Sequence, residues 1–199
     1  MGIISSREYY GFVGPHSYLT DSQKKAIAAE LDYPNENTLR EYERRFSQLI
    51  GIGTGVSFAA GRMAFYSLMK VLELKAGDEV ILLGFTCSVM PNAILRMGAK
   101  PVYIDLDKET LGSLPSSIED NITSKTKIIV AQHSFGIPCK VNEIVDIAKK
   151  HNIFLLEDCA ISIESSLNNV SVGNWGDAAI FSTDHTKPIN TLIGGFLYS

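Results

Sequence analysis

The sequence predicts an α/β protein built on a mostly parallel sheet, and three observations predict it. Short apolar segments alternate with amphipathic ones along the chain of 199 residues, which is typical of strands joined by helices. Several of these apolar segments are continuous, as in strands covered on both faces. Hydrophobic residues make up 45% and charged residues 20% of the chain, so it is globular. We therefore expect one domain, a three-layer sandwich with helices on both faces of the sheet.

The predicted domain begins with two helices. Residues 1–20 are expected to form an irregular N-terminal arm, and the domain proper spans residues 21–199. The polar run 20–23 has N-cap chemistry before a short helix at 24–31. After a loop at 34–37, a second helix should run from Thr38 to Ile50, because its apolar residues recur with a period of 3.6.

The rest of the chain supplies the seven strands of the sheet and the helices between them. The first strand is expected within residues 55–62, where it runs into a turn of small residues. The others are expected at residues 80–83, 100–105, 127–131, 153–156, 177–181 and 194–198. The intervening helices are expected at residues 63–74, 89–97, 115–121 and 141–151. A polar loop at 165–176 should precede the sixth strand.

Composition excludes several classes of function. The formal net charge of −4 argues against a nucleic-acid partner or an anionic membrane surface. No apolar run approaches the ~18 residues that span a bilayer, and the N-terminus lacks a signal-peptide core. The three cysteines (Cys87, Cys139 and Cys159) form no close-spaced pair. We interpret them as buried thiols in a reducing, cytoplasmic compartment, with no metal site.

Residues 157–187 contain side chains that could bind a cofactor. The acidic pair Glu157-Asp158 follows an apolar strand, and Ser182 and Lys187 follow the next one. A carboxylate can hold a pyridine nitrogen protonated, a hydroxyl can bind a phosphate, and a lysine amine can form a Schiff base with an aldehyde. The set therefore indicates pyridoxal 5'-phosphate. Taken singly, the acid could instead bind a metal or a ribose or cap a helix, and the lysine could be a solvated surface residue.

Two further segments offer candidate cofactor-binding residues. Small residues before Gly61 and Arg62 would let a phosphate approach a helix N-terminus, and Arg62 could add a charge-assisted contact. The alternative is a plain turn between a strand and a helix. His133 follows a predicted strand, where parallel sheets deliver residues to a binding crevice. It could line the cofactor ring or simply be a hydrogen-bonded wall residue.

The ordered motifs resemble one family of enzymes. The segments Glu157-Asp158-Cys159-Ala160, Gly173–Ser182, Lys187 and Gly194-Gly195 are similar to the DegT/StrS-type sugar aminotransferases. The resemblance implies the large domain of a fold type I pyridoxal phosphate transferase, with an antiparallel last strand. It also implies catalytic roles for Lys187 and Asp158. Cys87 stands where the family often has an aromatic ring stacked on the cofactor.

The resemblance further implies an activity. Such enzymes convert a keto group on a nucleotide-linked sugar into an amine, with glutamate as the expected donor, and their sites form at a homodimer interface. Family members are roughly twice this long and carry a small C-terminal domain that this sequence lacks.

Departures from the family keep other functions open. Ile161 stands where a polar residue is usual, which weakens the case for ordinary transamination. The alternative is a truncated, non-catalytic cofactor-fold module or partner subunit, and a related reaction such as dehydration also remains possible. A nucleotide-binding Rossmann domain is disfavoured, because no Gly-x-Gly-x-x-Gly follows the first strand.

Overall fold

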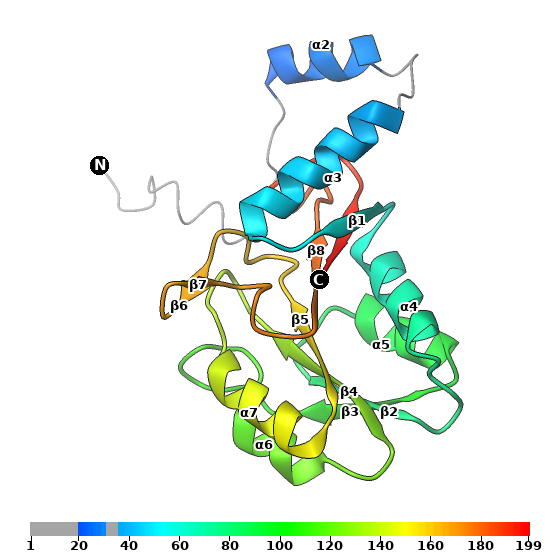
Figure 1. Cartoon of the computed structure of the whole chain (residues 1–199), viewed down its shortest axis with the longest axis vertical. Helices are drawn as coiled ribbons and strands as arrows, with labels where there is room; N and C mark the ends of the chain where they lie inside the picture. Colours follow the sequence, from blue (N-terminus) through cyan, green and yellow to red (C-terminus); the bar gives the residue numbers. More distant parts are fainter. Residues whose placement is uncertain (1–19, 31–35) are drawn as a thin grey trace.

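A single seven-stranded sheet organises the molecule (Figure 1). The computed structural model describes residues 20–30 and 36–199. In spatial order the strands of the sheet are β1 (Gly55–Phe58), β9 (Gly195–Tyr198), β8 (Ala178–Ser182), β5 (Phe154–Asp158), β4 (Thr126–Gln132), β2 (Glu79–Leu83) and β3 (Lys100–Ile104). Five neighbouring strands from β8 to β3 run parallel, whereas β9 is antiparallel to both β1 and β8. The predicted α/β class and the antiparallel last strand are confirmed.

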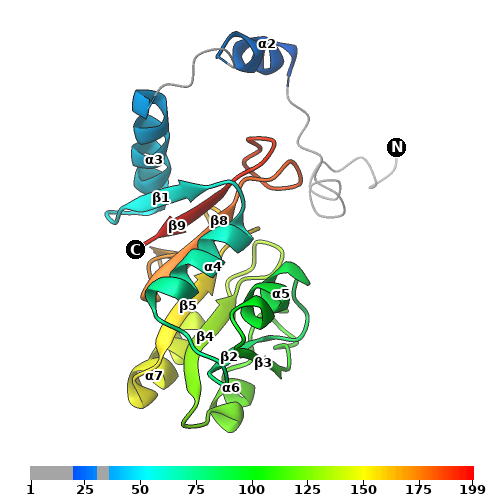
Figure 2. The same ribbon diagram turned by 90° about the vertical axis from the view of Figure 1, so that its right-hand side faces the viewer.

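Helices cover both faces of this sheet (Figure 2). The covering helices are α3 (Glu36–Ile50), α4 (Gly61–Val71), α5 (Val89–Arg96), α6 (Pro115–Asn121) and α7 (Val141–His151). The first described helix, α2 (Asp21–Glu30), lies away from the sheet and is mostly exposed (Figure 2). Thr20 and Gln23 form a reciprocal cap at the start of α2, with Gln23 N–H donating to Thr20 Oγ1 and Thr20 N–H to Gln23 Oε1. Capping within the predicted run is confirmed at Thr20, but the helix begins at Asp21 rather than at the predicted residue 24.

Successive buried side chains of a strand pack into different hydrophobic clusters on the two faces of the sheet. On β2, Val80 and Leu82 pack in the cluster under α4 and α5, while Ile81 packs in the cluster under α6 and α7. On β5, Leu156 faces the first cluster and Leu155 the second. Because successive side chains of a strand point to opposite faces, a sheet buried on both faces reads as a continuous apolar run. This is the predicted three-layer sandwich.

A third, aromatic cluster joins α3 to the last strands. The ring of Phe46 lies 4.5 Å from that of Phe196 and 5.7 Å from that of Phe181, measured between centroids. Ile50 and Tyr198 are buried in the same cluster. It fixes the end of the sheet where β1 and β9 pair.

Two local predictions are wrong, and one lies beyond what the structure describes. The predicted loop at 34–37 gives way to helix at Glu36, where α3 begins. The predicted loop at 165–176 contains a small hairpin, β6 (Ser166–Leu167) and β7 (Val170–Ser171), whose strands are too short to produce an apolar signal. The N-terminal arm falls outside the described residues, apart from Thr20. Within residues 20–30 and 36–199, no helix is long and apolar enough to cross a membrane.

Candidate active site

A cavity of about 310 Å³ lies where β5 and β8 end and α4 begins. Parallel strands deliver their carboxyl ends to one edge of a sheet, so residues distant in sequence meet there. Six of the seven residues that the sequence singled out for the cofactor line this cavity: Gly61, Arg62, Cys87, Asp158, Ser182 and Lys187.

Asp158 is the buried acid of the cavity. It is the last residue of β5, its exposed fraction is 7%, and its Oδ1 accepts a hydrogen bond from Ala160 N–H at 3.0 Å. Burial raises the pKa of this carboxyl, and the Ala160 N–H and the charge of nearby Lys187 offset that effect only in part. A cation placed against Asp158 would stabilise its charged form.

Lys187 is presented by a tight turn after β8. Its N–H donates to Asp184 O at 2.9 Å, and Thr186 N–H donates to Asp184 Oδ1 at 3.2 Å. Asp184 Oδ1 also lies 2.9 Å from His185 Nδ1. The aspartate thus organises the turn around its own backbone, as Asx turns do, and holds the lysine at the cavity wall.

The other end of the cavity is formed by the start of α4. Its N-cap is Ala60, which has no side-chain acceptor for the N–H groups of the first turn. Gly195 lies so close that an added Cβ would fall 2.2 Å from Gly61 N, and Gly61 in turn packs against the end of β8 beside Ser182. A helix N-terminus and a serine hydroxyl at one wall are the kind of groups that bind anions in other proteins.

A second lobe of about 250 Å³ shares Cys87, Asp158, Ala160 and Lys187 with the first. Ile161 lines it, and so do Phe85 and Phe135, whose ring centroids are 6.0 Å apart. The prediction that all three cysteines are buried is wrong for Cys87, which is exposed at the cavity. It sits in the short turn before α5 rather than in a strand, and no other segment among residues 20–30 and 36–199 buries it.

His133 occupies a different position from the other candidates. Its side chain is fully buried, although it borders the second lobe. Cys139 N–H donates to Nδ1 at 3.1 Å, and Nε2 lies 3.0 Å from Glu157 Oε2. Because a backbone N–H can only donate, Nδ1 is an acceptor and the ring proton is on Nε2. Both ring nitrogens are thus used inside the protein, as the alternative of a wall residue predicts.

Glu157 is the site-adjacent residue that sequence reasoning passed over. It is fully buried and accepts hydrogen bonds from Gly173, Trp175 and Gly176 N–H as well as from His133. Of the acidic pair Glu157-Asp158, the sequence pattern indicates a cofactor-binding role only for Asp158. The signal that could have found Glu157 is the alternation of β5, which sends one of two adjacent acids into the core.

His133, Glu157 and Cys159 also place their ligand atoms within 4.8 Å of one another. The hydrogen bonds just described account for His133 and Glu157 without an ion. Burial raises the pKa of the Cys159 thiol, which favours the protonated sulfur in the metal-free protein.

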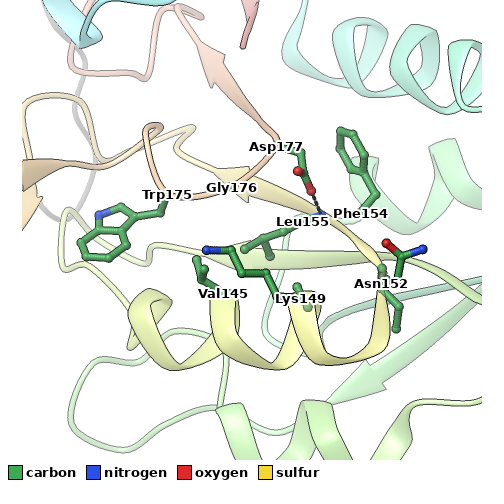
Figure 3. Close-up of a pocket in the computed structure, with 10 residues that line it drawn as sticks. Val145, Lys149, Asn152, Phe154, Leu155, Trp175, Gly176 and Asp177 are labelled. Atoms are coloured by element: carbon green, nitrogen blue, oxygen red, sulfur yellow. Dashed lines mark hydrogen bonds between the residues drawn. The ribbon is translucent and has the colours of Figure 1, made fainter.

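A further hollow of about 400 Å³ lies at the opposite end of β5, between α7 and residues 175–177. Figure 3 shows Lys149 of α7 beside it and the carboxylate of Asp177 directed at Leu155, whose N–H it accepts at 2.7 Å. This hollow shares no lining residue with the cavity that holds Asp158 and Lys187.

The cavity with Asp158 and Lys187 fits pyridoxal phosphate by the chemistry of its donors. A buried carboxylate whose charge is only partly compensated suits a protonated pyridine nitrogen. The start of α4 with Ser182 suits a phosphate, and Lys187 lies on the same cavity wall. Cys87 and Ala160 supply small neutral surfaces rather than an aromatic ring.

Comparison with known proteins agrees with this description. The profile of the DegT/DnrJ/EryC1/StrS aminotransferase family matches residues 23–199. A GDP-perosamine synthase of Escherichia coli O157:H7 is 33% identical over 191 residues, which cover 90% of this chain and 52% of that protein. The chain thus spans about half the length of the curated relative it matches.

Solved structures give the same result. An aminotransferase from Psychrobacter cryohalolentis superposes with a TM-score of 0.86 at 29% identity, covering 94% of this chain and 48% of that one. An E. coli GDP-4-keto-6-deoxy-D-mannose-3-dehydratase with bound hydrated PLP superposes with a TM-score of 0.81 at 27% identity, covering 91% of this chain and 49% of that one.

Proposed function

The chain belongs to the DegT/DnrJ/EryC1/StrS aminotransferase family, and from this membership we propose that its cavity binds pyridoxal phosphate and serves the amination of a keto group on a nucleotide-linked sugar. The observation that carries the proposal is the convergence of Asp158, Ser182 and Lys187 on one cavity. Residues brought together from separate strand ends match the three functional groups of the cofactor.

Each residue has a distinct task in this proposal. Bound pyridoxal phosphate supplies an electron sink for negative charge on the reacting carbon. The Asp158 carboxylate pairs with the protonated ring nitrogen and so favours the electron-accepting form. Ser182 and the first turn of α4 at Gly61 and Arg62 bind the phosphate. The Lys187 amine would hold the cofactor aldehyde, and the same amine would carry the proton at the reacting carbon.

Substrate, donor and location follow from the family. We propose a nucleotide-linked keto sugar as acceptor and glutamate as donor, and the sequence-based prediction of a cytoplasmic enzyme stays part of this proposal. A homodimer is also proposed, because large apolar side chains are exposed around the start of α4 and on α5. Met63 is 50% and Leu95 57% exposed, and a groove between these helices adjoins Arg62.

Ile161 favours a second candidate. It lines the lobe beside Lys187, where family members usually place a polar residue. A module that binds the cofactor without transaminating, or a dehydrating enzyme on the same cofactor, would tolerate an apolar residue there.

Covalent labelling tests the cofactor site. The native chain should develop a visible absorbance band with pyridoxal phosphate, and borohydride reduction with peptide mass mapping should locate the label on Lys187. Lys187→Arg keeps the charge and should abolish the band. The matched control Lys149→Arg, in the distant hollow, should leave it unchanged. Label scattered over surface lysines in the native chain would contradict the proposal.

Turnover distinguishes the two candidates once the label is located. The chain, with whatever further residues its natural protein carries, should convert keto sugar nucleotides to amino sugars with glutamate. A labelled protein that yields a deoxygenated sugar, or no product at all, would favour dehydration or the non-catalytic module.

A further inference from the structure

We infer that Glu157 is a positioning residue that sets where β8, and with it Ser182 and Lys187, lies relative to Asp158. The inference rests on the proposed cofactor site, because it concerns the spacing of the groups that would hold the two ends of one ligand. Glu157 faces away from the cavity, on the side of β5 that packs toward α3 and α7, since adjacent strand residues point to opposite faces.

Four donors converge on the Glu157 carboxylate. Oε1 accepts Trp175 N–H at 2.7 Å and Gly176 N–H at 2.8 Å. Oε2 accepts Gly173 N–H at 2.8 Å and the His133 Nε2 proton at 3.0 Å. The side chain has no exposed surface. All four partners are donors, so the site requires a carboxylate, and any replacement that brings an N–H group would oppose another N–H.

Glycine lets the backbone come this close. At Gly176 an added Cβ would lie 2.7 Å from Leu155 O, and at Gly173, where φ is +92°, it would lie 2.8 Å from the Phe181 ring. A side chain at either position would push the loop away from β5. The glycines therefore let the backbone N–H groups of residues 173–176 come within hydrogen-bonding distance of the Glu157 oxygens.

The tethered loop leads directly into β8. Asp177 adds a second anchor by accepting Leu155 N–H (Figure 3), and β8 begins at the next residue. Along β8 the pairing with β5 places Ile180 opposite Asp158, and Ser182 ends the strand two residues later. The distance from Asp158 to Ser182 and Lys187 therefore depends on where the loop is held.

His133 couples the same carboxylate to the neighbouring strand. Its N–H donates to Asp158 O at 3.1 Å, and its ring donates to Glu157. Because His133 Nδ1 accepts the Cys139 N–H, the ring proton is on Nε2, where it is donated to Glu157. Thus β4, β5 and the loop before β8 meet at one carboxylate directly behind the cavity.

The test compares Glu157→Gln with a matched change elsewhere. Glu79→Gln alters another buried carboxylate that accepts two side-chain hydrogen bonds, from Thr123 and Lys100, at the start of β2. Pyridoxal phosphate binding is titrated by absorbance at a temperature where circular dichroism shows each protein folded. Because small misplacements of binding groups are costly, Glu157→Gln should raise the dissociation constant roughly 10-fold or more and spread the borohydride label away from Lys187.

Glu79→Gln should leave both the affinity and the label within about two-fold of the native chain. Equal losses in the two variants, or native-like binding in Glu157→Gln, would overturn the inference. If Glu157→Gln does not fold, Gly176→Ala takes its place with the same expectations, because an added Cβ 2.7 Å from Leu155 O would push the loop away from the Glu157 carboxylate.

An amide-exchange measurement separates this inference from the proposed function. Without any cofactor, Glu157→Gln should speed hydrogen exchange at residues 173–176 and at 182–187 while β2 and β4 stay protected. If the native chain fails to bind pyridoxal phosphate, the proposed function is refuted. The hydrogen-exchange rates still test whether Glu157 positions β8. Unchanged exchange at 182–187 would refute it.

Discussion

At the scale of single residues, Asp158 combines burial with a charge that its surroundings only partly stabilise. Burial raises the pKa of the carboxyl above its usual range. The sign of the pH effect follows from linkage: a raised folded pKa costs nothing below the unfolded value of about 4 and costs its full amount above the folded value. The free protein is therefore less stable at neutral pH than it would be with a neutral residue there.

Asp158→Asn tests this conflict between stability and binding. The amide retains an oxygen for Ala160 N–H, so the variant should melt at the same or a higher temperature than the native chain at pH 8. The difference in melting temperature between the variant and the native chain should decrease toward pH 4. Pyridoxal phosphate binding should weaken by about 2–5 kcal/mol, as when one partner of a buried charge pair is removed. A variant less stable than the native chain at pH 8 would contradict this account.

At the scale of elements, Asp107 ties the loop after β3 to the start of α7. Its Oδ1 accepts Glu109 and Thr110 N–H, each at 2.9 Å, and Lys140 Nζ lies 2.8 Å from Oδ2. These contacts, with that from Lys140 the largest, lower the pKa of Asp107 to about 2. A depressed folded pKa stabilises the fold above the unfolded value, and this contribution disappears as the pH falls toward 2.

Asp107→Ala should destabilise the fold by about 1–3 kcal/mol at pH 7, because it removes hydrogen bonds made to a charged group. Urea unfolding measures the difference, which should narrow between about pH 4 and pH 2. Lys140→Met removes only the partly exposed partner and should destabilise the fold less than Asp107→Ala does. A constant difference across that pH range would show that the carboxylate charge is not responsible.

At the scale of the whole molecule, exposed apolar side chains beside the cavity predict self-association. Met63 at the start of α4 is 50% exposed and lines the groove next to Arg62. Exposed apolar surface of this kind is typical of a protein–protein interface. We expect a second copy of the chain to cover it.

Sedimentation velocity tests the association. The native chain should form dimers at micromolar concentration, and Met63→Lys should weaken the dimer at least about 10-fold, because a charge would be buried at the interface. Val170→Lys, in the β6–β7 hairpin, is the matched control and should leave the dimer intact. A native chain that stays monomeric at every concentration would refute the expectation.

The sequence by itself determined which segments become strands and which residues line the cavity at their ends. Continuous apolar runs such as Ile128–Val130 predict buried strands because both faces of each strand are covered. The positions of Asp158, Ser182 and Lys187 at or beyond strand ends then predict one edge of the sheet as the site. These are local signals, read from spacing along the chain.

Only the tertiary structure decided the roles of Glu157, His133 and Cys87. Glu157 gains its partners from a loop 16 to 19 residues away, and His133 is buried because it meets Glu157 across two paired strands. Cys87 is exposed because no other segment of the described chain buries its turn. Hydrophobic periodicity reports whether a side chain faces the core, whereas hydrogen-bond partners depend on which strands become neighbours, and that is fixed by packing of the whole sheet.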